Sequence, residues 1–464
     1  MSSSSVGRRQ VARPQSVSRL TFYELLLERE TLSVGNSPLS DIDYSELSDI
    51  GMRRFNNQDS YVSVVAKTED RYATHGHLFV VADGMGAHAA GELASQIATD
   101  QISRSYLRVP AVSQESLKLA FDEANREIHS KGQSNPEFHN MGTTASGLAI
   151  TPQGAFIAHV GDSRVYRLRG FQLEQLTFDH SLVWEIEANP ELRLDSWSGP
   201  IPKNVITRSL GPNAQVEIDV EGPFPLEQGD RFILCSDGLT GVVDDEEVGT
   251  IVGCLNTQNA AQVLVDLANL RGGPDNITVT VVEVKKKHST DLPEVAERTT
   301  PTARAGASGS FSIAMAAAFF SAVLLGVLGL VMQWPFLILS GILFTAGIGM
   351  ACIARSKSSG EIKVEPIAKP SKAKSPYRSY NARPTKDLYQ RLGDTVQALR
   401  EAAADQNWLM DWDAVNAHQA RGEEHVSEGN ANHAIESQAH AIIEAMKQLR
   451  DQQNRSANDT AVDL

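Results

Sequence analysis

The sequence is poor in cysteine, and its few cysteines are too far apart to act together. In 464 residues there are only Cys235, Cys254 and Cys352, with no Cys-x-x-Cys spacing. This pattern argues against a zinc ribbon and against a disulfide framework, and it favours a reduced, cytosol-facing protein. Residues 1–20 are rich in serine and arginine and lack an apolar run, so we expect no secretory signal.

The chain also has fewer basic than acidic residues. The chain carries 42 Lys and Arg residues against 57 Asp and Glu residues, which gives a formal net charge of -15. An acidic balance argues against nucleic acid as a partner and for cation binding, although excess acid usually forms only a solvated surface. A chain of this length is expected to form two or more domains.

One long stretch lacks charge of either sign. No Asp, Glu, Lys or Arg occurs between Arg304 and Arg355, and residues 311–333 and 336–354 are nearly all apolar. As a helix, the first run of 23 residues would span about 35 Å, enough for a hydrocarbon core of ~30 Å, whereas one helix over all 44 residues would reach about 66 Å. We therefore predict two transmembrane helices that form a hairpin over residues 311–354. A buried pair of soluble helices is the alternative.

Basic residues flank the predicted hairpin on both sides. Lysines occupy residues 285–287 before it, and Arg355 and Lys357 follow it. With two spans, basic flanks at both ends place both soluble parts in the cytoplasm. We therefore expect a multi-pass protein of the cell membrane, with two spans and cytoplasmic soluble parts, whereas a single span would separate those parts.

The sequence between residues 44 and 287 is typical of a mixed α/β domain with a sizeable core. Short β-branched or apolar runs predict buried strands, and helical spacing of apolar residues predicts two long helices between them. The strands are expected at residues 78–82, 155–160, 231–235 and 277–282, and the helices at residues 91–106 and 114–131.

The remaining segments differ in composition. Residues 1–43 are expected to be disordered apart from one short helix, and residues 288–310 form a Pro/Thr/Ala/Gly linker. Residues 355–386 contain nine Lys or Arg against two Glu and predict an unstructured basic linker, either held against anionic lipid or simply solvated. Residues 387–452 predict a helical hairpin, and residues 453–464 a tail.

The helical segment has a weak likeness to a tetratricopeptide repeat. Gly422, Gly429, Ala434 and Ala441 fall at offsets that resemble this repeat. Only one such unit is visible, and repeats of this kind stabilise one another by stacking. The segment is therefore expected to be a protein-interaction module whose partner the sequence does not identify.

Five short acidic motifs are spread over the α/β domain. Mg²⁺ and Mn²⁺ prefer carboxylate, carbonyl and water oxygens as ligands, so aspartates from distant motifs can build one metal site if the fold brings them together. The motifs are Arg54-Phe-Asn-Asn-Gln-Asp59, Ala82-Asp-Gly-Met-Gly86, Val160-Gly-Asp-Ser-Arg164, Ser236-Asp-Gly-Leu239 and Asp275-Asn276.

Together with their order, these motifs resemble those of PPM/PP2C-type, metal-dependent Ser/Thr protein phosphatases of the bacterial branch. The resemblance covers just over half of the chain and implies a β-sandwich flanked by helices (αββα), followed here by two transmembrane helices and an all-α tail. It rests on Gly51-x-x-Arg54-x-x-Asn57-Gln58-Asp59, Asp83-Gly-Met-Gly86, Met141-Gly-Thr-Thr144, Gly161-Asp-Ser-Arg164, Thr177-Phe-Asp-His-Ser181, Ser236-Asp-Gly-Leu239 and Asp275-Asn-Ile-Thr278.

The resemblance implies a centre with two Mn²⁺ or Mg²⁺ ions. Asp83 would bridge them and the Gly84 carbonyl would bind one, while Asp237 and Asp275 would complete the shell of the second. Asp59 would bind or orient metal-held water. Two such ions make hydroxide available near neutral pH and neutralise charge as it attacks phosphorus, so no Ser, His or Cys nucleophile is required.

Other positions of the family pattern imply further roles. Arg54 would hold phosphate, because its planar fork can bind two oxygens at once. Glu137 and Asp179 fall where bacterial relatives bind a third, weaker ion, although Glu137 replaces an Asp. Asp162 is expected to be structural, in a buried pair with Arg164.

Three departures from the family pattern bear on chemistry. Met85 stands where animal enzymes have histidine, as in the bacterial branch, and the group that protonates the leaving serine stays open between His88, His180 and neither. Gln58 replaces a frequent Glu and Ala87 a frequent Gly. None of these changes removes a first-choice metal ligand.

The sequence therefore predicts a membrane-tethered protein phosphatase that acts on phosphoserine and phosphothreonine of cytoplasmic proteins. Its expected partners are phosphorylated proteins and a Ser/Thr kinase that it opposes or whose substrates it shares. Two alternatives are a catalytically dead scaffold and a membrane-anchored adaptor whose phosphatase domain is regulatory. Retention of Arg54, Asp83, Asp237 and Asp275 favours an active enzyme.

Overall fold

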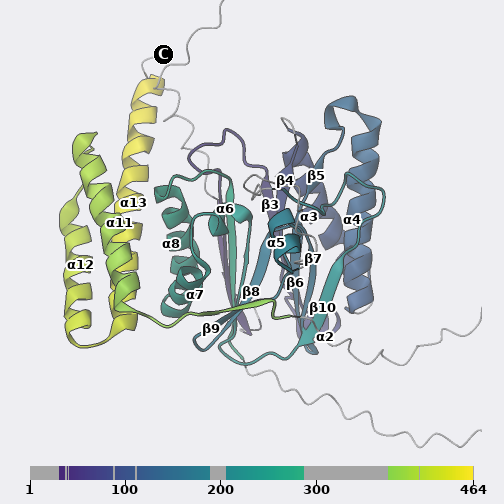
Figure 1. Ribbon diagram of the computed structural model, residues 1–464, viewed down its shortest axis with the longest axis horizontal. Coiled ribbons are helices and arrows are strands. Elements are labelled where there is room, and N and C mark those ends of the chain that lie inside the picture. Colours follow the sequence, from purple (N-terminus) through teal and green to yellow (C-terminus); the bar gives the residue numbers. More distant parts are fainter. Residues whose placement is uncertain are drawn as a thin grey trace, which may run out of the picture. The chain divides into compact units, whose positions relative to one another are not determined.

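The chain divides into two units, one of residues 1–290 with 372–464 and one of residues 291–371. All of the residues that the structure describes belong to the first unit, and its elements are labelled in Figure 1. This computed structural model describes residues 31–36, 39, 41–86, 89–109, 112–188, 205–286, 375–406 and 408–462.

The predicted transmembrane hairpin over residues 311–354 lies outside the described residues, and so do the linker 288–310 and the head of the chain up to residue 30. Within the described ranges, none of the helices combines the length and the apolar character needed to span a bilayer. The hairpin therefore stays a prediction from the sequence.

Two antiparallel sheets form the centre of the first unit (Figure 1). The seven-stranded sheet has the order β1 (Thr31–Asn36), β2 (Ile42–Asp49), β12 (Ile277–Val284), β11 (Arg231–Cys235), β8 (Arg164–Arg169), β9 (Gln172–Gln175) and β13 (Arg378–Asn381). The second sheet has the order β10 (Asp219–Phe224), β7 (Gly154–Val160), β6 (Ala145–Thr151), β4 (His77–Met85) and β3 (Asp59–Val64), and β5 (Gly142–Thr143) pairs with β4.

Strand β4 shows why the two sheets form a sandwich. Its side chains alternate between two hydrophobic clusters, since successive residues of a strand point to opposite faces. Leu78 and Val80 join the cluster beneath the helices, whereas Phe79 and Val81 join the cluster between the sheets. Because both faces of β4 are buried, its sequence is a continuous apolar run. The four predicted strands are confirmed as β4, β7, β11 and β12.

Helices cover the outer face of each sheet. Helices α3 (Ala90–Arg108) and α4 (Gln114–Ser134) share a core with the sheet of β4, and α8 (Thr257–Leu270) packs on β2 and β12. A capping box at Ser113 begins α4, and the Asn256 side chain caps α8. The αββα arrangement and both predicted long helices are confirmed.

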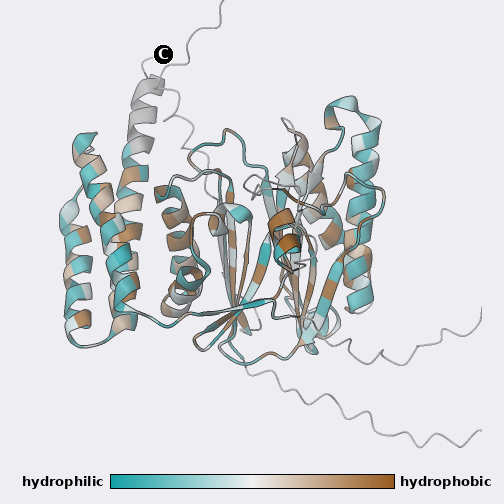
Figure 2. Ribbon diagram, viewed as in Figure 1, coloured by the Kyte–Doolittle hydropathy of each residue, from teal (hydrophilic) through white to brown (hydrophobic). Residues whose placement is uncertain are grey.

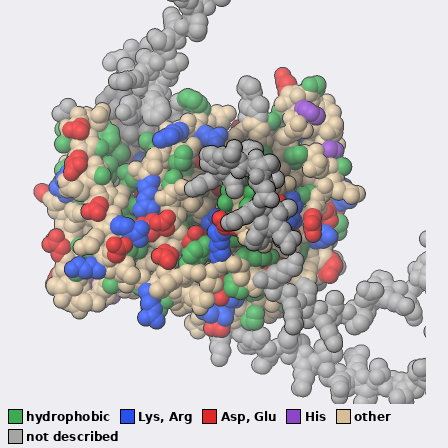
Figure 3. Space-filling view, viewed as in Figure 1, with side chains coloured by type: hydrophobic (Ala, Val, Ile, Leu, Met, Phe, Trp, Pro, Cys, Tyr) green, Lys and Arg blue, Asp and Glu red, His purple; other side chains and the backbone are tan. Residues whose placement is uncertain are grey.

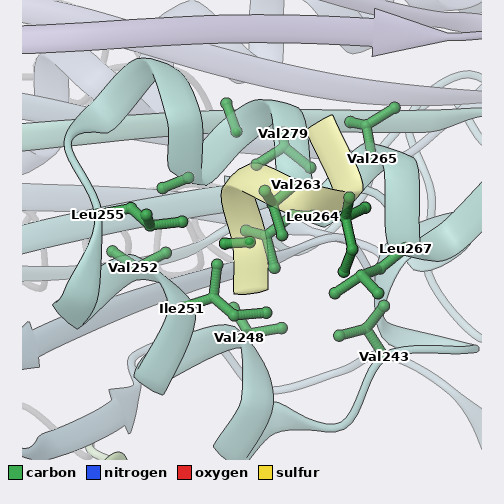
Figure 4. Packing of buried hydrophobic residues seen from close by; sticks show 14 of the residues in the cluster. Val243, Val248, Ile251, Val252, Leu255, Val263, Leu264, Val265, Leu267 and Val279 are labelled. Atoms are coloured by element: carbon green, nitrogen blue, oxygen red, sulfur yellow. The ribbon is translucent and has the colours of Figure 1, made fainter. Parts of the chain in front are cut away.

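The core of the second helical layer lies between α8 and α7 (Asp245–Cys254). Figure 4 shows labelled valine, leucine and isoleucine side chains of α7 and α8 close together, with Val279 of β12 nearby. Ile251 and Leu264 have no exposed surface. This layer also contacts the C-terminal helices.

The C-terminal segment forms three helices that pack on the α/β domain. They are α11 (Lys386–Asp405), α12 (Trp412–Ser427) and α13 (Ala431–Val462), and α13 contacts both α7 and α8. Along α11 the buried residues recur at helical spacing. In Figure 2 hydrophilic and hydrophobic residues are interspersed along these helices. Leu392, Ile435 and Ile442 belong to the same hydrophobic cluster as α7 and α8.

Two sequence-based boundaries are wrong. Residues 375–386, assigned to the unstructured basic linker, contain β13, which pairs with β9 from Arg378 opposite Gln175 to Asn381 opposite Gln172. An edge strand presents unpaired N–H and C=O groups, and here a segment remote in sequence pairs with them. Likewise β1 lies within residues 1–43, which were expected to be disordered or helical, because it pairs with β2.

The repeat likeness is restricted to α12 and α13. A Cβ atom on Gly422 would lie 2.9 Å from the Tyr389 ring and 3.5 Å from the carbonyl oxygen of Ala434, so glycine allows close helix packing there. Gly429 has a φ of +77° in the turn between the two helices. Helix α11 supplies a third helix that the predicted hairpin lacked.

Charged side chains accompany the apolar contact between the tail and the domain. On the face seen in Figure 3, basic and acidic side chains lie interspersed. Arg391 of α11 lies 3.5 Å from the buried Glu247 of α7. Arg450 of α13 donates to Asp266 of α8 at 2.7 Å, and the Asp266 side chain is fully buried.

Removal of the Arg450 side chain tests this docking. Arg450→Ala leaves a buried carboxylate whose other hydrogen-bond donor is Gln262 at 3.2 Å, so we expect a loss of about 3 kcal/mol in the free energy of unfolding. Arg400→Ala, which removes a half-buried guanidinium over Trp412, is the matched control and should cost about 0.5 kcal/mol. Chemical denaturation of the full chain measures both.

The loss should depend on pH. Burial raises the pKa of Asp266 to about 6 and Arg450 acts in the opposite direction, so the variant's pKa is higher still. A carboxyl whose pKa is higher in the folded than in the unfolded chain destabilises the fold as pH rises through that range. Arg450→Ala should therefore cost more at pH 8 than at pH 5, and an equal loss at both values would contradict this account.

Candidate metal centre

Two of the predicted metal-binding aspartates lie opposite one another in one sheet. Asp59 begins β3 and pairs in register with Asp83 of β4, which places both side chains on the same face. Asp59 accepts hydrogen bonds from the hydroxyls of Ser236 and Thr278, both at 2.7 Å. These two donors come from the other sheet, so Asp59 joins the two sheets at this edge.

The other two predicted ligands lie beside β11 and β12, which are neighbouring strands of the seven-stranded sheet. Asp237 begins α6 (Asp237–Thr240) directly after β11, and Asp275 precedes β12. The turns that carry them are tightly packed. A Cβ atom on Gly238 would lie 2.0 Å from the carbonyl oxygen of Asn276, and one on Gly51 would lie 2.0 Å from that of Asp275. Glycine is therefore required at both positions.

Asn276 fixes the loop that carries Arg54 and Asp59. Its side-chain amide donates to the carbonyl oxygens of Ile50 at 2.8 Å and Asn56 at 3.0 Å, and its side-chain oxygen accepts from the Gln58 amide at 2.9 Å. The sequence marked Asn276 as part of a motif but did not reveal this role. Ser236 and Thr278, the hydroxyl donors to Asp59, were likewise quoted in motifs without a function.

Gly84 lies within β4, and its amide donates to the Gln58 carbonyl at 3.0 Å. A Cβ atom there would lie 2.1 Å from the carbonyl oxygen of Gly91 in α3. Glycine is therefore required at this position by the close approach of α3.

The clustered carboxyl groups raise one another's pKa. Burial, followed by the neighbouring charges, raises the pKa of Asp59 to about 7 and that of Asp83 well above its usual value. Burial and Asp275 raise the pKa of Asp237, while a hydrogen bond with Asp83 and the charge of Arg54 act in the opposite direction. Such mutual repulsion disappears when a cation is bound, since the cation neutralises the carboxylates.

The donor chemistry fits a hard divalent cation. Asp59 and Asp162 each have one buried carboxylate oxygen, Oδ1, without a hydrogen-bond partner in the described part of the protein. In that same part, no three Asp, Glu, His or Cys side chains meet closely enough to form a ligand set. One of the predicted ligands, Asp275, instead accepts a hydrogen bond from Arg54 through Oδ2 at 2.6 Å.

Asp162 belongs to this acidic group, and the expected Asp162–Arg164 pair is wrong. Burial, Asp237 and Asp179 raise the pKa of Asp162 to about 7. Arg164 instead pairs with Asp179 at 2.7 Å and with Asp245 at 3.1 Å. Sequence adjacency suggested the wrong partner because the β8–β9 hairpin and the loop after it bring Asp179 against Arg164.

The predicted third metal site stays a prediction. Both carboxylate oxygens of Asp179 already accept hydrogen bonds, one from Arg164 and the other from Gln175 at 2.7 Å. Glu137 is exposed in the short 3-10 helix η1 (Pro136–Phe138). A third ion at Asp179 would share these oxygens with Arg164 and Gln175.

The histidines named as candidate acids differ in position. His180 is buried, accepts from the Gly161 amide at 3.0 Å and lies 3.1 Å from Asp219. These contacts fix the ring in the loop after β9. His88 lies outside the described residues. Cys235 is a core residue, since it is fully buried in β11, and burial raises its pKa to about 12.

Known proteins match the part of the chain that holds this centre. Residues 55–268 match the family described as protein phosphatase 2C. The chain is 35% identical over 254 residues to protein phosphatase PhpP of Streptococcus pneumoniae, which covers 53% of this chain and 99% of that protein. It is 35% identical over 242 residues to the serine/threonine phosphatase stp of Listeria monocytogenes, with coverage of 51% and 93%.

Solved structures of similar sequence cover the same share of the chain. The catalytic domain of the serine/threonine protein phosphatase PstP, in complex with two manganese ions, is 30% identical. The match covers 55% of this chain and 100% of that structure, with a TM-score of 0.44. The helices α11–α13 lie beyond residues 55–268, the part that matches the phosphatase family.

Removal of one charge tests the acidic group. We expect Asp237→Asn to raise the melting temperature by about 2–4 °C in chelator at pH 8, because one repelling charge is lost. The variant should also lose most of the stabilisation that Mn²⁺ gives the parent chain, because a ligand is lost. Thermal denaturation with and without Mn²⁺ measures both effects.

The matched control is Glu217→Gln, which neutralises a carboxylate whose side chain is 80% exposed. It should behave like the parent chain under both conditions. An Asp237→Asn variant that melts lower than the parent in chelator, or that keeps the full response to Mn²⁺, would overturn the assignment.

Proposed function

Because the chain belongs to the protein phosphatase 2C family and is a protein-serine/threonine phosphatase, we propose that it hydrolyses phosphoserine and phosphothreonine in cytoplasmic proteins with two Mn²⁺ or Mg²⁺ ions. The observation that carries this proposal is the pairing of Asp59 with Asp83 across β3 and β4, with Asp237 and Arg54 near enough for their charges to act on the group. The preference between Mn²⁺ and Mg²⁺ is left open, since both favour carboxylate oxygens.

The aspartates would hold the ions. Asp83 and the Gly84 carbonyl supply ligands from β4, while Asp237 and Asp275 supply them from the other sheet, and Asp59 orients water. When bound, two such ions supply the acidified water and the positive charge that phosphomonoester hydrolysis requires. Ser236 and Thr278 keep the Asp59 carboxylate in place through their hydroxyls.

Arg54 would bind the phosphate of the substrate. Its side chain is 45% exposed and its guanidinium lies 2.6 Å from Asp275, at the border between the acidic group and solvent. A substrate phosphate can replace this carboxylate as the partner, and its oxygens match the two-pronged guanidinium. Asp275 would then be released to bind a cation, so substrate and metal binding are expected to support one another.

The activity test uses the purified full chain with a phosphothreonine peptide and p-nitrophenyl phosphate. We expect Mn²⁺-dependent turnover and a loss in kcat of at least about 100-fold for Asp237→Ala, because a metal ligand is removed. Arg54→Lys should raise KM by about tenfold with a smaller change in kcat, because one ammonium replaces the planar fork.

The same assay separates the alternatives. Turnover by the parent chain no faster than that of Asp237→Ala would identify a catalytically dead scaffold or an adaptor. Phosphate release in chelator equal to that with Mn²⁺ would contradict the two-ion mechanism. Glu217→Gln again serves as the control, with kinetics expected to match those of the parent.

We also propose that the enzyme is tethered to the cell membrane with both soluble parts in the cytoplasm, where it opposes a Ser/Thr kinase. This rests on the sequence of residues 311–354, which contains no charged side chain, and on the basic residues at both of its ends. In addition, β13 pairs with β9, so residues on the two sides of this stretch belong to one sheet. An even number of spans satisfies that pairing.

Reporter fusions test the topology. Reporters of cytoplasmic location joined after Lys287 and after Lys386, in separate chains, should both be active, because two spans return the chain to its starting side. A fusion after Gln333, between the two predicted spans, is the control and should be inactive. Opposite signals from the first two fusions would exclude the hairpin, and recovery of the full chain in the soluble fraction would exclude the tether.

A further inference from the structure

The tail contacts the phosphatase domain a second time, at helix α5 (Leu182–Ala188), through the residues just before and at the start of β13. The guanidinium of Arg378 lies 3.8 Å from the ring centroid of Trp184, and it also pairs with Glu187. Both partners are on α5. We call residues 375–378 the tail contact.

Polar groups anchor the tail contact at its other end. Ser375 donates to Glu221 of β10 from its amide at 3.0 Å and from its hydroxyl at 2.7 Å, and the Tyr377 hydroxyl donates to the same carboxylate. The Tyr377 amide donates to the Gln175 carbonyl at 2.9 Å. The segment is thus fixed to both sheets before it reaches α5.

Aromatic packing joins the tail contact to the loop that precedes α5. Phe178 packs edge-on against Tyr377 at 5.5 Å and against Trp184 at 5.2 Å. Trp184 is only 7% exposed although α5 is short. A seven-residue helix has little stability of its own, so these side-chain contacts determine where it lies.

Side-chain contacts lead from α5 to Arg164 and Asp179, whose charges act on the acidic group. The Arg164 guanidinium lies 5.8 Å from the Trp184 ring centroid and pairs with Asp179. Besides burial, the charge of Asp179 raises the pKa of Asp162 and that of Arg164 lowers it, and Asp162 belongs to the acidic group.

We propose that Tyr377 and Arg378 are positioning residues of the phosphatase, which fix α5 and Arg164 beside the acidic group so that the tail acts as a built-in activator. The inference rests on the proposed function for its effect on turnover. It does not follow from the family, because the tail contact lies beyond residues 55–268. The enzyme therefore requires a segment that follows its catalytic domain by about a hundred residues in the sequence.

The experiment compares three substitutions in the full chain. Arg378→Ala should lower kcat/KM for the phosphothreonine peptide with Mn²⁺ by about fivefold to tenfold, because the stacking and the ion pair are both lost. Arg378→Lys, which keeps the charge for Glu187 but not the planar stacking, should lower it by about twofold to threefold.

Arg383→Ala is the matched control, since this guanidinium also lies over an aromatic ring of the domain, that of Phe171 at 5.4 Å, in the turn between β8 and β9. It should stay within about twofold of the parent chain. In a chain that already carries Trp184→Leu, Arg378→Ala should lower kcat/KM by a further factor of less than about two, because the stacking partner of Arg378 is already absent.

Hydrogen exchange gives a readout that does not need turnover. Arg378→Ala should speed amide exchange in α5 by about tenfold, whereas Arg383→Ala should leave it unchanged. Activity of Arg378→Ala within twofold of the parent, or losses that multiply with Trp184→Leu, would overturn the proposal. If the parent chain has no Mn²⁺-dependent turnover, the proposed function fails instead, and unchanged exchange in α5 would then overturn the positioning role.

Discussion

The crowding of aspartates at one edge of the sandwich is the constraint on which the rest of the structure depends. Burial raises the pKa of Asp83, and so do the neighbouring charges of Asp59, Asp237 and Asp162. Such a group is costly without a counter-charge, so the fold fixes it with hydroxyl donors, an amide side chain and Arg54. The same crowding makes the edge a receptor for divalent cations.

The structure also joins the C-terminal segment to the catalytic domain more closely than a separate module would be. Helix α13 shares the hydrophobic cluster of α7 and α8, and β13 extends the seven-stranded sheet. The C-terminal segment follows residues 291–371 in the sequence, whereas the catalytic domain precedes them. The first unit is therefore built from two remote stretches of chain.

Much of this organisation was predictable from particular residues. Residues 78–82 are continuously apolar because both faces of β4 are buried, and the helical spacing at 91–106 and 114–131 correctly indicated α3 and α4. The strand β13 was not predictable, since its sequence, Arg-Ser-Tyr-Asn, has no apolar alternation. It is a strand because β9 offers a free edge, and this is a property of the partner.

The sequence by itself determined the family, the set of acidic motifs and the apolar stretch at 311–354, because each is a local pattern of residue types with a direct chemical meaning. Only the tertiary structure decided which charges pair. Arg164 pairs with Asp179 and Asp245 rather than with Asp162, and Arg378 reaches Trp184 and Glu187. Ion pairing depends on distance in space, and residues far apart in sequence become neighbours only when the sheets and the tail are assembled.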